Sequence, residues 1–130
     1  LAGDVAELQI EGIPATDTFG LYGGSDDADN SGTLSYVSIR HGGAEIGAGN
    51  EINGLTLGGV GSGTTINNVE VFATFDDGIE YFGGKVSTSN VIVYGFGDDG
   101  LDIDQSYSGT ISNGMVIKAA IADYKQKRGG

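Results

Sequence analysis

A 22-residue repeat is the feature that most constrains how this 130-residue chain can fold. The first copy contains the segments 68–71 (NVEV) and 76–81 (DDGIEY), and the second contains 90–93 (NVIV) and 98–103 (DDGLDI). Every landmark of the first copy recurs 22 positions later. A fixed period of this length is typical of repeat architectures, in which each unit covers the core of its neighbour.

Two less regular copies precede these. The segment 34–39 matches 66–71, and the segment 53–59 matches 77–83. The earlier coil is longer by ten residues, most of which lie between Gly42 and Asn50. The pieces 8–10 and 19–21 read as an opening coil, and Ile111 begins a fifth coil that stops at Ile117.

Within each repeat, short alternating strands are separated by Gly, Asn, Asp and Ser, so one side of each strand faces inward. Because equivalent apolar residues recur once per repeat, they must stack along one axis. A coil of 22 residues suits three short strands and three bends. The sequence therefore predicts an all-β fold, a short right-handed parallel β-helix of four to five coils. The predicted inward residues are Val37, Ile39, Leu55, Leu57, Val69, Val71, Ile79, Tyr81, Val91, Val93, Leu101 and Ile103.

Two further patterns predict corners and an end to the solenoid. Gly78 and Gly100 follow Asp-Asp pairs, where a residue without Cβ can adopt a positive φ. Asn68 and Asn90 recur at another bend, where stacked amides can form a ladder of hydrogen bonds. Residues 118–130 are rich in Ala and Lys and contain strong helix formers. We expect a β-helix over 1–117 and a helical cap over 118–130, or alternatively a tail left by truncation of a longer helix.

The charge distribution excludes several classes of partner. The net charge is −12, and residues 1–117 contain 17 acidic residues but only two basic ones, Arg40 and Lys85. An acidic body repels nucleic acid and anionic membranes, and no apolar run is long enough to span a bilayer. No cysteine is present, and no glycine-rich phosphate-binding loop can be placed between a strand and a helix. We expect neither an organic cofactor nor membrane insertion; calcium, neutral partners and simple solubility remain as explanations of the acidity.

Three carboxylates are candidates for catalysis. With the inward residues assigned, these three carboxylates and Phe82 point outward to solvent from neighbouring strands: Glu80, Asp102 and Asp104. Adjacent strands lie about 4.8 Å apart, so Glu80 and Asp102 sit close to the separation of a retaining glycosidase pair. Glu80 and Asp104 lie on a diagonal of about 8 Å, which is nearer the separation of an inverting pair. Like charges this close raise one pKa and leave one acid and one carboxylate near neutral pH. The alternatives are a solvated acidic stripe and a calcium site that relieves the repulsion.

Two acidic groups are candidates for binding calcium. The Asp-Asp pairs of the two repeats stack carboxylates at one corner, where they either accept backbone N–H bonds or hold a cation. The segment 27–34 places Asp, Asp, Ser and Gly at the first, third, fifth and sixth positions of an EF-hand-like loop, although no flanking helix is expected. It is either a calcium loop or a set of Asx turns. The candidate ligands are Asp27, Asp29, Ser31, Asp76, Asp77, Asp98 and Asp99.

An outward column on another strand combines a cation with aromatic rings. Arg40, Phe72 and Tyr94 occupy matching positions in three consecutive coils, and His41 lies beside them. An Arg over two rings suggests a cation–π stack, and exposed aromatic rings in a row provide a platform for the flat faces of sugars. The column could instead be covered by the insertion between Gly42 and Asn50. A lone histidine is more often structural than catalytic.

The segments 50–66 and 76–84 carry a resemblance to a known family. Together with 29–37 and 98–104, they resemble secreted bacterial surface proteins with right-handed parallel β-helix repeats, within the pectate-lyase-like superfamily. The resemblance covers residues 8–113 and implies a β-helix that is secreted or on the cell surface. It implies no particular activity. More distantly, Gly-Asp-Asp-Gly is similar to sequences in pectate lyases and polygalacturonases, but their Gly-His-Gly and Arg-Ile-Lys elements are absent here.

Two functional classes follow. The first is an extracellular carbohydrate-active module that binds a polysaccharide or cell-surface glycan. If it is an enzyme, it is a glycoside hydrolase that uses the paired carboxylates. The second is a structural or adhesive segment of a bacterial surface protein that is stiffened by calcium. Exposed coil ends also suggest self-association by end-to-end stacking.

Overall fold

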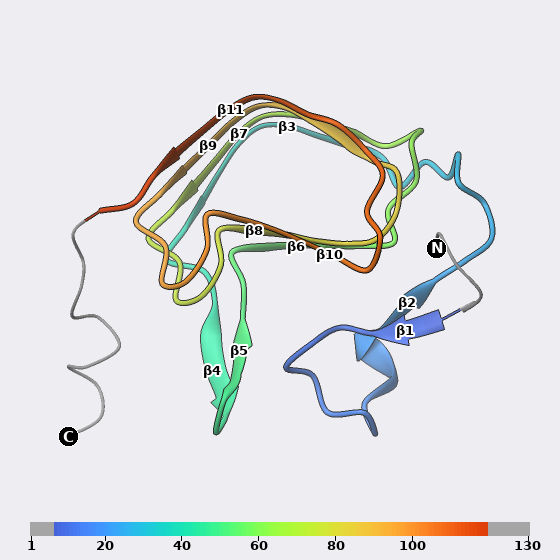
Figure 1. The fold of residues 1–130 in the computed structure, drawn as a ribbon, viewed down its shortest axis with the longest axis horizontal. Coiled ribbons are helices and arrows are strands. Elements are labelled where there is room, and N and C mark those ends of the chain that lie inside the picture. Colours follow the sequence, from blue (N-terminus) through green and yellow to red (C-terminus); the bar gives the residue numbers. More distant parts are fainter. Residues whose placement is uncertain (1–6, 120–130) are drawn as a thin grey trace.

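The computed structural model describes residues 7–119, which form two facing parallel sheets, with two small hairpins on the outer side of one of them (Figure 1). A single 3-10 turn, Thr18–Gly20, lies in this range. The strands are β1 (Glu7–Gln9), β2 (Leu21–Gly23), β3 (Thr33–Arg40), β4 (Ala44–Gly47), β5 (Asn50–Ile52), β6 (Leu55–Gly58), β7 (Thr65–Phe72), β8 (Ile79–Phe82), β9 (Ser87–Tyr94), β10 (Leu101–Asp104) and β11 (Ile111–Ile117).

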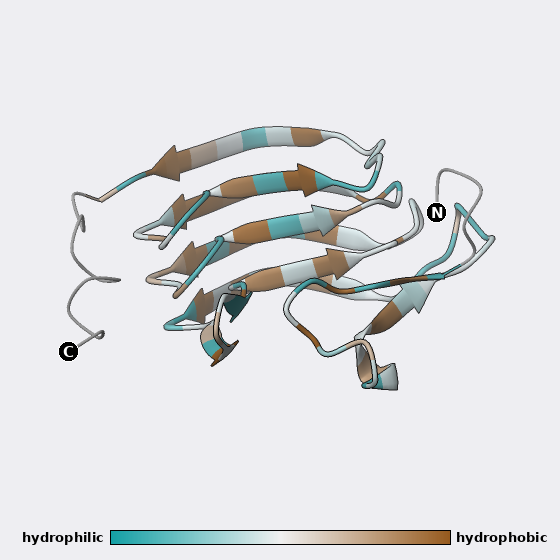
Figure 2. Cartoon of the chain, turned by 60° about the horizontal axis from the view of Figure 1, so that its bottom comes forward, coloured by the Kyte–Doolittle hydropathy of each residue, from teal (hydrophilic) through white to brown (hydrophobic). Residues whose placement is uncertain are grey.

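The two large sheets establish a short parallel β-helix, as the repeat predicts. One sheet has the order β11-β9-β7-β3 and the other the order β10-β8-β6, and all their pairs are parallel. Three coils contribute one strand to each sheet, β11 adds a fourth strand to the first sheet alone, and the strands lie as parallel rungs (Figure 2). The register pairs Val69 with Val91 and Ile79 with Leu101, so the 22-residue period is the pairing register itself.

Each long strand bends at one residue in the left-handed conformation. These residues are Tyr36, Asn68, Asn90 and Asn113, with φ between 52° and 55°. The bend divides the long strand into two straight segments, so the three short strands expected per coil become two strands, one of them bent. The Nδ2 of Asn90 donates to Asn68 at 3.2 Å, and the Nδ2 of Asn113 donates to Asn90 at 3.1 Å. These two bonds confirm the predicted asparagine ladder.

The core lies between the two sheets and is densest in the middle coils. Val71, Ile79, Tyr81 and Val91 are completely buried there. The core also contains a polar contact, because the Tyr81 and Thr88 hydroxyls are hydrogen-bonded at 2.8 Å. The alternation of inward residues is correct for these coils. At the end of the solenoid, Ile103 in β10 continues the inward column of Tyr81 but is 55% exposed, because no described coil covers it.

The predicted opening coil is wrong. Residues 7–9 and 21–23 form the antiparallel pair β1–β2 rather than a rung of the solenoid. Period and alternation cannot distinguish the two, since short alternating segments occur in both arrangements. The excess residues of the long coil lie where the alignment places them and form a second antiparallel hairpin, β4–β5. Both hairpins lie outside the β10-β8-β6 sheet (Figure 1).

Gly78 and Gly100 are required for a reason that differs from the expected one. Neither residue has a positive φ. Instead, a Cβ built on Gly78 would lie 2.2 Å from Cγ1 of Val93, and one on Gly100 would lie 2.3 Å from Cγ1 of Val116. The two glycines allow the corner of each coil to press against the opposite sheet. The expected helical cap lies, apart from Lys118 and Ala119, outside the described residues.

Candidate functional site

The outer face of the β6–β8–β10 sheet carries the predicted catalytic carboxylates. Thr56, Glu80 and Asp102 form one row across the three strands, and Gly58, Phe82 and Asp104 form the next. The prediction that Glu80 and Phe82 face solvent is wrong, because they are only 4% and 2% exposed. Asp102 is half-buried, and only Asp104 is exposed.

The N-terminal residues 7–23, here called the N-terminal cover, bury this face. Tyr22 packs against Phe82 with 5.9 Å between ring centroids. A Cβ on Gly58 would approach Tyr22 to 3.0 Å, so the glycine makes room for the ring. Burial, followed by the charges of Asp104 and Glu80, raises the pKa of Tyr22, whose buried hydroxyl has no hydrogen-bond partner within residues 7–119. Tyr22 therefore extends over the carboxylate face.

Carboxylate oxygens of Asp77, Glu80 and Asp102 all lie within 4.8 Å of one another, and these three residues are here called the carboxylate cluster. Asn53 donates a short hydrogen bond from Nδ2 to Glu80. Burial is the main cause that raises the pKa of Glu80 to about 8, and Asp77, Asp102 and Glu11 add to it. Glu80 is thus a protonated acid at neutral pH, beside two further carboxyl groups.

Asp77 has a structural role in the same cluster. Its Oδ1 accepts a hydrogen bond from the backbone N–H of Asp99 at 2.8 Å, and its own N–H donates to Asn53 at 3.3 Å. Burial raises its pKa, as do the charges of Asp102, Asp98 and Asp99, while the backbone bond lowers it. The prediction that a stacked aspartate accepts a backbone N–H bond at this corner is therefore confirmed for Asp77.

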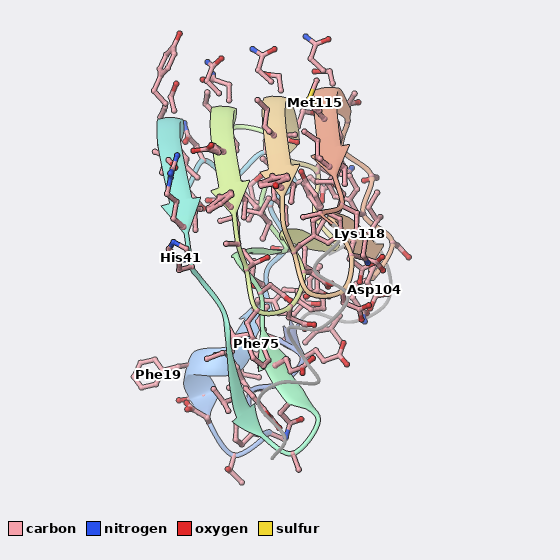
Figure 3. The ribbon with its side chains drawn as sticks, turned by 90° about the vertical axis from the view of Figure 1, so that its left-hand side faces the viewer. Phe19, His41, Phe75, Asp104, Met115 and Lys118 are labelled. Atoms are coloured by element: carbon pink, nitrogen blue, oxygen red, sulfur yellow. The ribbon has the colours of Figure 1, made fainter. Side chains whose placement is uncertain are left out.

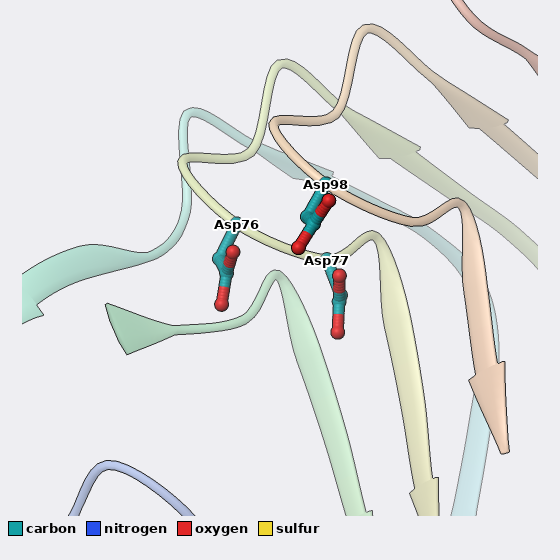
Figure 4. Close-up of side chains that lie close together, drawn as sticks. All are labelled: Asp76, Asp77 and Asp98. Atoms are coloured by element: carbon teal, nitrogen blue, oxygen red, sulfur yellow. The ribbon is translucent and has the colours of Figure 1, made fainter. Parts of the chain in front are cut away.

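A second acidic group overlaps the first at this corner. Oxygens of Asp76, Asp77 and Asp98 also lie within 4.8 Å of one another (Figure 4). The side chain of Asp99 belongs to neither group; its backbone N–H donates to Asp77, and its carbonyl oxygen accepts a hydrogen bond from the N–H of Gly78 at 2.9 Å. Three of the four stacked aspartates thus offer hard oxygen ligands of the type that Ca²⁺ prefers.

The loop at residues 26–32 is a set of Asx turns. The side chains of Asp26 and Asn30 accept hydrogen bonds from backbone N–H groups two residues ahead, at 2.9 and 2.8 Å. Ser31 donates to Asp29 at 2.9 Å, while Asp27 forms an ion pair with Lys85 at 2.5 Å. A cation therefore already neutralises the first predicted calcium ligand.

The predicted aromatic column is present on the other sheet. Phe72 and Tyr94 stack with centroids 5.3 Å apart and planes at 20°, and Arg40 lies 5.4 Å from the centre of Phe72. His41 meets the edge of the same ring at 5.8 Å. We call Arg40, His41, Phe72 and Tyr94 the aromatic strip. Arg40 also pairs with Glu70 at 2.8 Å, which fixes the guanidinium beside the rings.

Sequence reasoning missed two members of the carboxylate face. Asn53 is the counterpart of Asp77 one coil earlier, so the alignment of 53–59 with 77–83 already placed it in the same column. Tyr22 has no such signal, because it comes from a segment outside the repeat. A hollow of about 350 Å³ lies beside this face and reaches Asn53 but not Glu80. It is lined by Ile10, Glu11, Ile13, Tyr22, Ile52, Asn53, Thr56 and Gly58.

Comparison with known proteins gives a family. No curated protein and no solved structure matches the chain significantly. Within residues 7–119, no helix is long and apolar enough to cross a membrane. The family model for the pectate-lyase-like beta helix domain matches residues 13–129, which cover both parallel sheets and all the candidate sites. The chain therefore belongs to the pectate-lyase-like β-helix domain family.

Proposed function

We propose that this chain is the polysaccharide-binding module of a secreted or cell-surface protein. The observation that carries the proposal is the aromatic strip, in which two stacked and partly exposed rings are flanked by an arginine and a histidine. Aromatic faces pack against the C–H faces of pyranose rings, and the guanidinium and imidazole can hydrogen-bond sugar hydroxyls. The strip is rigid because Phe72 and Tyr94 are in-register neighbours on β7 and β9.

Removal of the ring of Tyr94 or of Phe72 is expected to weaken glycan binding about five- to thirtyfold, since each loses a stacking surface worth roughly 1–2 kcal/mol. The measurement is isothermal titration with a panel of soluble oligosaccharides, including oligogalacturonides, on the parent chain and on Tyr94→Ala and Phe72→Ala. Tyr36→Ala is the matched control, because Tyr36 is 85% exposed on β3 but lies outside the strip. Equal loss in all three variants, or no binding by the parent, would count against the proposal.

Hydrolysis at the carboxylate cluster is a second candidate activity. It is favoured by one observation: Glu80, with a pKa of about 8, lies beside the carboxylate of Asp102. A glycosidase needs such a proton donor next to an ionised partner, and Asp104 on the next row would be a third group within reach of a substrate. The N-terminal cover must move before a polymer reaches Glu80. We therefore rank glycan binding at the aromatic strip above hydrolysis as the proposed function.

Hydrolysis predicts reducing-sugar release that falls on the alkaline side as Glu80 ionises near pH 8. Glu80→Gln removes the proton donor and should abolish turnover. Glu45→Gln, which removes an exposed carboxylate of β4 outside both the carboxylate cluster and the aromatic strip, should leave turnover intact. Absence of turnover by the parent chain across a broad glycan panel would remove this candidate.

Calcium stabilisation is the structural alternative. The carboxylate cluster and the Asp76–Asp77–Asp98 group each bring three oxygens within 4.8 Å, which is a donor set that Ca²⁺ can take. A bound ion would replace the proton on Glu80 and relieve the repulsion. The chain would then serve as a stiff segment of a surface protein, and its stability would depend on calcium.

A further inference from the structure

We propose that copies of this chain stack end to end, with β10 and β11 of one copy pairing in parallel with β6 and β3 of the next. Along their outer edges, β10 and β11 pair with no strand among residues 7–119, and neither do β6 and β3 at the opposite end. Figure 3 shows the two ends on opposite flanks, one marked by His41 after β3 and the other by Met115 in β11. Free edges are templates for strand addition.

Exposed core residues mark the end formed by β10 and β11. Within the sheets, the inward column of Ile39, Val71, Val93 and Val116 goes from fully buried at Val71 to 46% exposed at Val116. Ile103 likewise continues the column of the fully buried Tyr81 but is 55% exposed. Both side chains face the position that the core of another coil would fill.

The other end supplies the matching half of the same packing. Continuing the register by one rung places Val116 on the half-buried Ile39 and Ile103 beside Leu57 of the second copy. Leu57 is already only 7% exposed, so the new apolar contact at this end comes mainly from Ile39, and on the other copy from Val116 and Ile103. The continued register repeats the contacts that β7 already makes with β3 and that β8 makes with β6. The proposed interface is therefore one more turn of the interface between coils.

Charge favours this head-to-tail arrangement over a symmetric contact between two β10 ends. β10 carries Asp102 and Asp104, and β6 and β3 contain no acidic residue. Stacking in register places the two aspartates beside the neutral Thr56 and Gly58. Joining two β10 ends would set acids against acids. A head-to-tail contact does not close on itself, so the product is an open filament rather than a dimer.

Cysteine cross-linking tests the register, because the native sequence contains no cysteine. Met115 and Ser38 lie in one outward column, so stacking brings them onto adjacent strands about 4.8 Å apart, within reach of a disulfide. Met115→Cys mixed with Ser38→Cys should give a disulfide-linked pair under mild oxidation. Met115→Cys mixed with Glu70→Cys is the control, since Glu70 lies one rung further away.

Sedimentation velocity over a range of concentrations tests the association itself. Ile103→Lys places a charge in the interface and should weaken association at least about tenfold. Ile92→Lys is the matched control, because Ile92 is 45% exposed on the outer face of a middle strand, and this variant should associate like the parent. Circular dichroism checks that both variants fold. A parent chain that stays monomeric, equal cross-linking in the two mixtures, or a preference for Met115→Cys homodimers would overturn the proposal.

Discussion

Replacing Glu80 with glutamine is expected to stabilise the fold at alkaline pH by several kcal/mol. In the folded chain the pKa of Glu80 is raised from 4.5 to about 8, mainly by burial and then by Asp77, Asp102 and Glu11. A raised carboxyl pKa means that the stability is fully present below pH 4.5 and is lost as pH rises toward 8. The full difference corresponds to roughly 4–5 kcal/mol. Glutamine cannot ionise, and it still accepts the hydrogen bond from Asn53.

The measurement is urea unfolding of the parent and of Glu80→Gln at pH values from 5 to 9, without divalent ions. We expect the difference between the two to be small at the lowest pH and to grow with pH, in favour of the variant. Glu70→Gln is the control; it removes an exposed carboxylate that pairs with Arg40, and because exposed ion pairs contribute little, it should leave the pH dependence of stability close to that of the parent. A difference in unfolding free energy between parent and Glu80→Gln that does not depend on pH would contradict the assignment of Glu80 as a buried carboxyl with a raised pKa.

Adding calcium to the same unfolding series separates the structural alternative from the protonated acid. If the carboxylate cluster holds Ca²⁺, millimolar calcium at pH 9 should restore the stability of the parent, and EDTA should reverse the effect. Glu80→Gln and Asp102→Asn would then gain less, because each removes a ligand. An equal response in parent and variants would place any calcium effect elsewhere.

Substitution of Gly78 by alanine is the second change with a large expected effect. The added Cβ would lie 2.2 Å from Cγ1 of Val93 and 2.6 Å from the carbonyl oxygen of Gly100, which leaves the backbone no room to adjust. We expect a loss of about 3 kcal/mol or more, seen as a decrease in melting temperature of about 10 °C or more.

The sequence offers a close control for Gly78→Ala. Gly114 lies in β11, where the nearest atom to a new Cβ is at an ordinary 3.6 Å. Gly114→Ala should therefore change stability by less than about 0.5 kcal/mol. Equal melting temperatures for the two alanine variants would show that the corner is less tightly packed than the structure indicates.

The repeat in the sequence was sufficient to predict most of the fold. Coils of different length still align, because solenoid contacts are made between equivalent positions. Val37 pairs with Val69 across the long coil, and Val69 pairs with Val91 across the regular one. The asparagine ladder and the stack of Phe72 on Tyr94 follow from the same rule. Such contacts can be predicted from spacing alone, since strand pairing places residues one repeat apart in the sequence on adjacent strands.

The burial of the candidate site could not be predicted in this way. Alternation correctly places Glu80 on the outer side of β8, but the N-terminal cover then buries it, and Tyr22 lies outside the repeat. The same limit explains the error at residues 7–23, where two short alternating segments pair with each other rather than with the solenoid. Period and alternation describe contacts between coils, and they carry no information on segments packed across a coil.

Mapping a bound oligosaccharide onto the chain tests the proposed function most directly. The measurement is a titration of isotopically labelled protein followed by amide chemical shifts, with the best ligand from the oligosaccharide panel. We expect perturbations centred on Arg40, His41, Phe72 and Tyr94, with little change on β8 and β10. Perturbations centred instead on Glu80, Asp102 and Asp104 would contradict binding at the aromatic strip and would place carbohydrate on the carboxylate face.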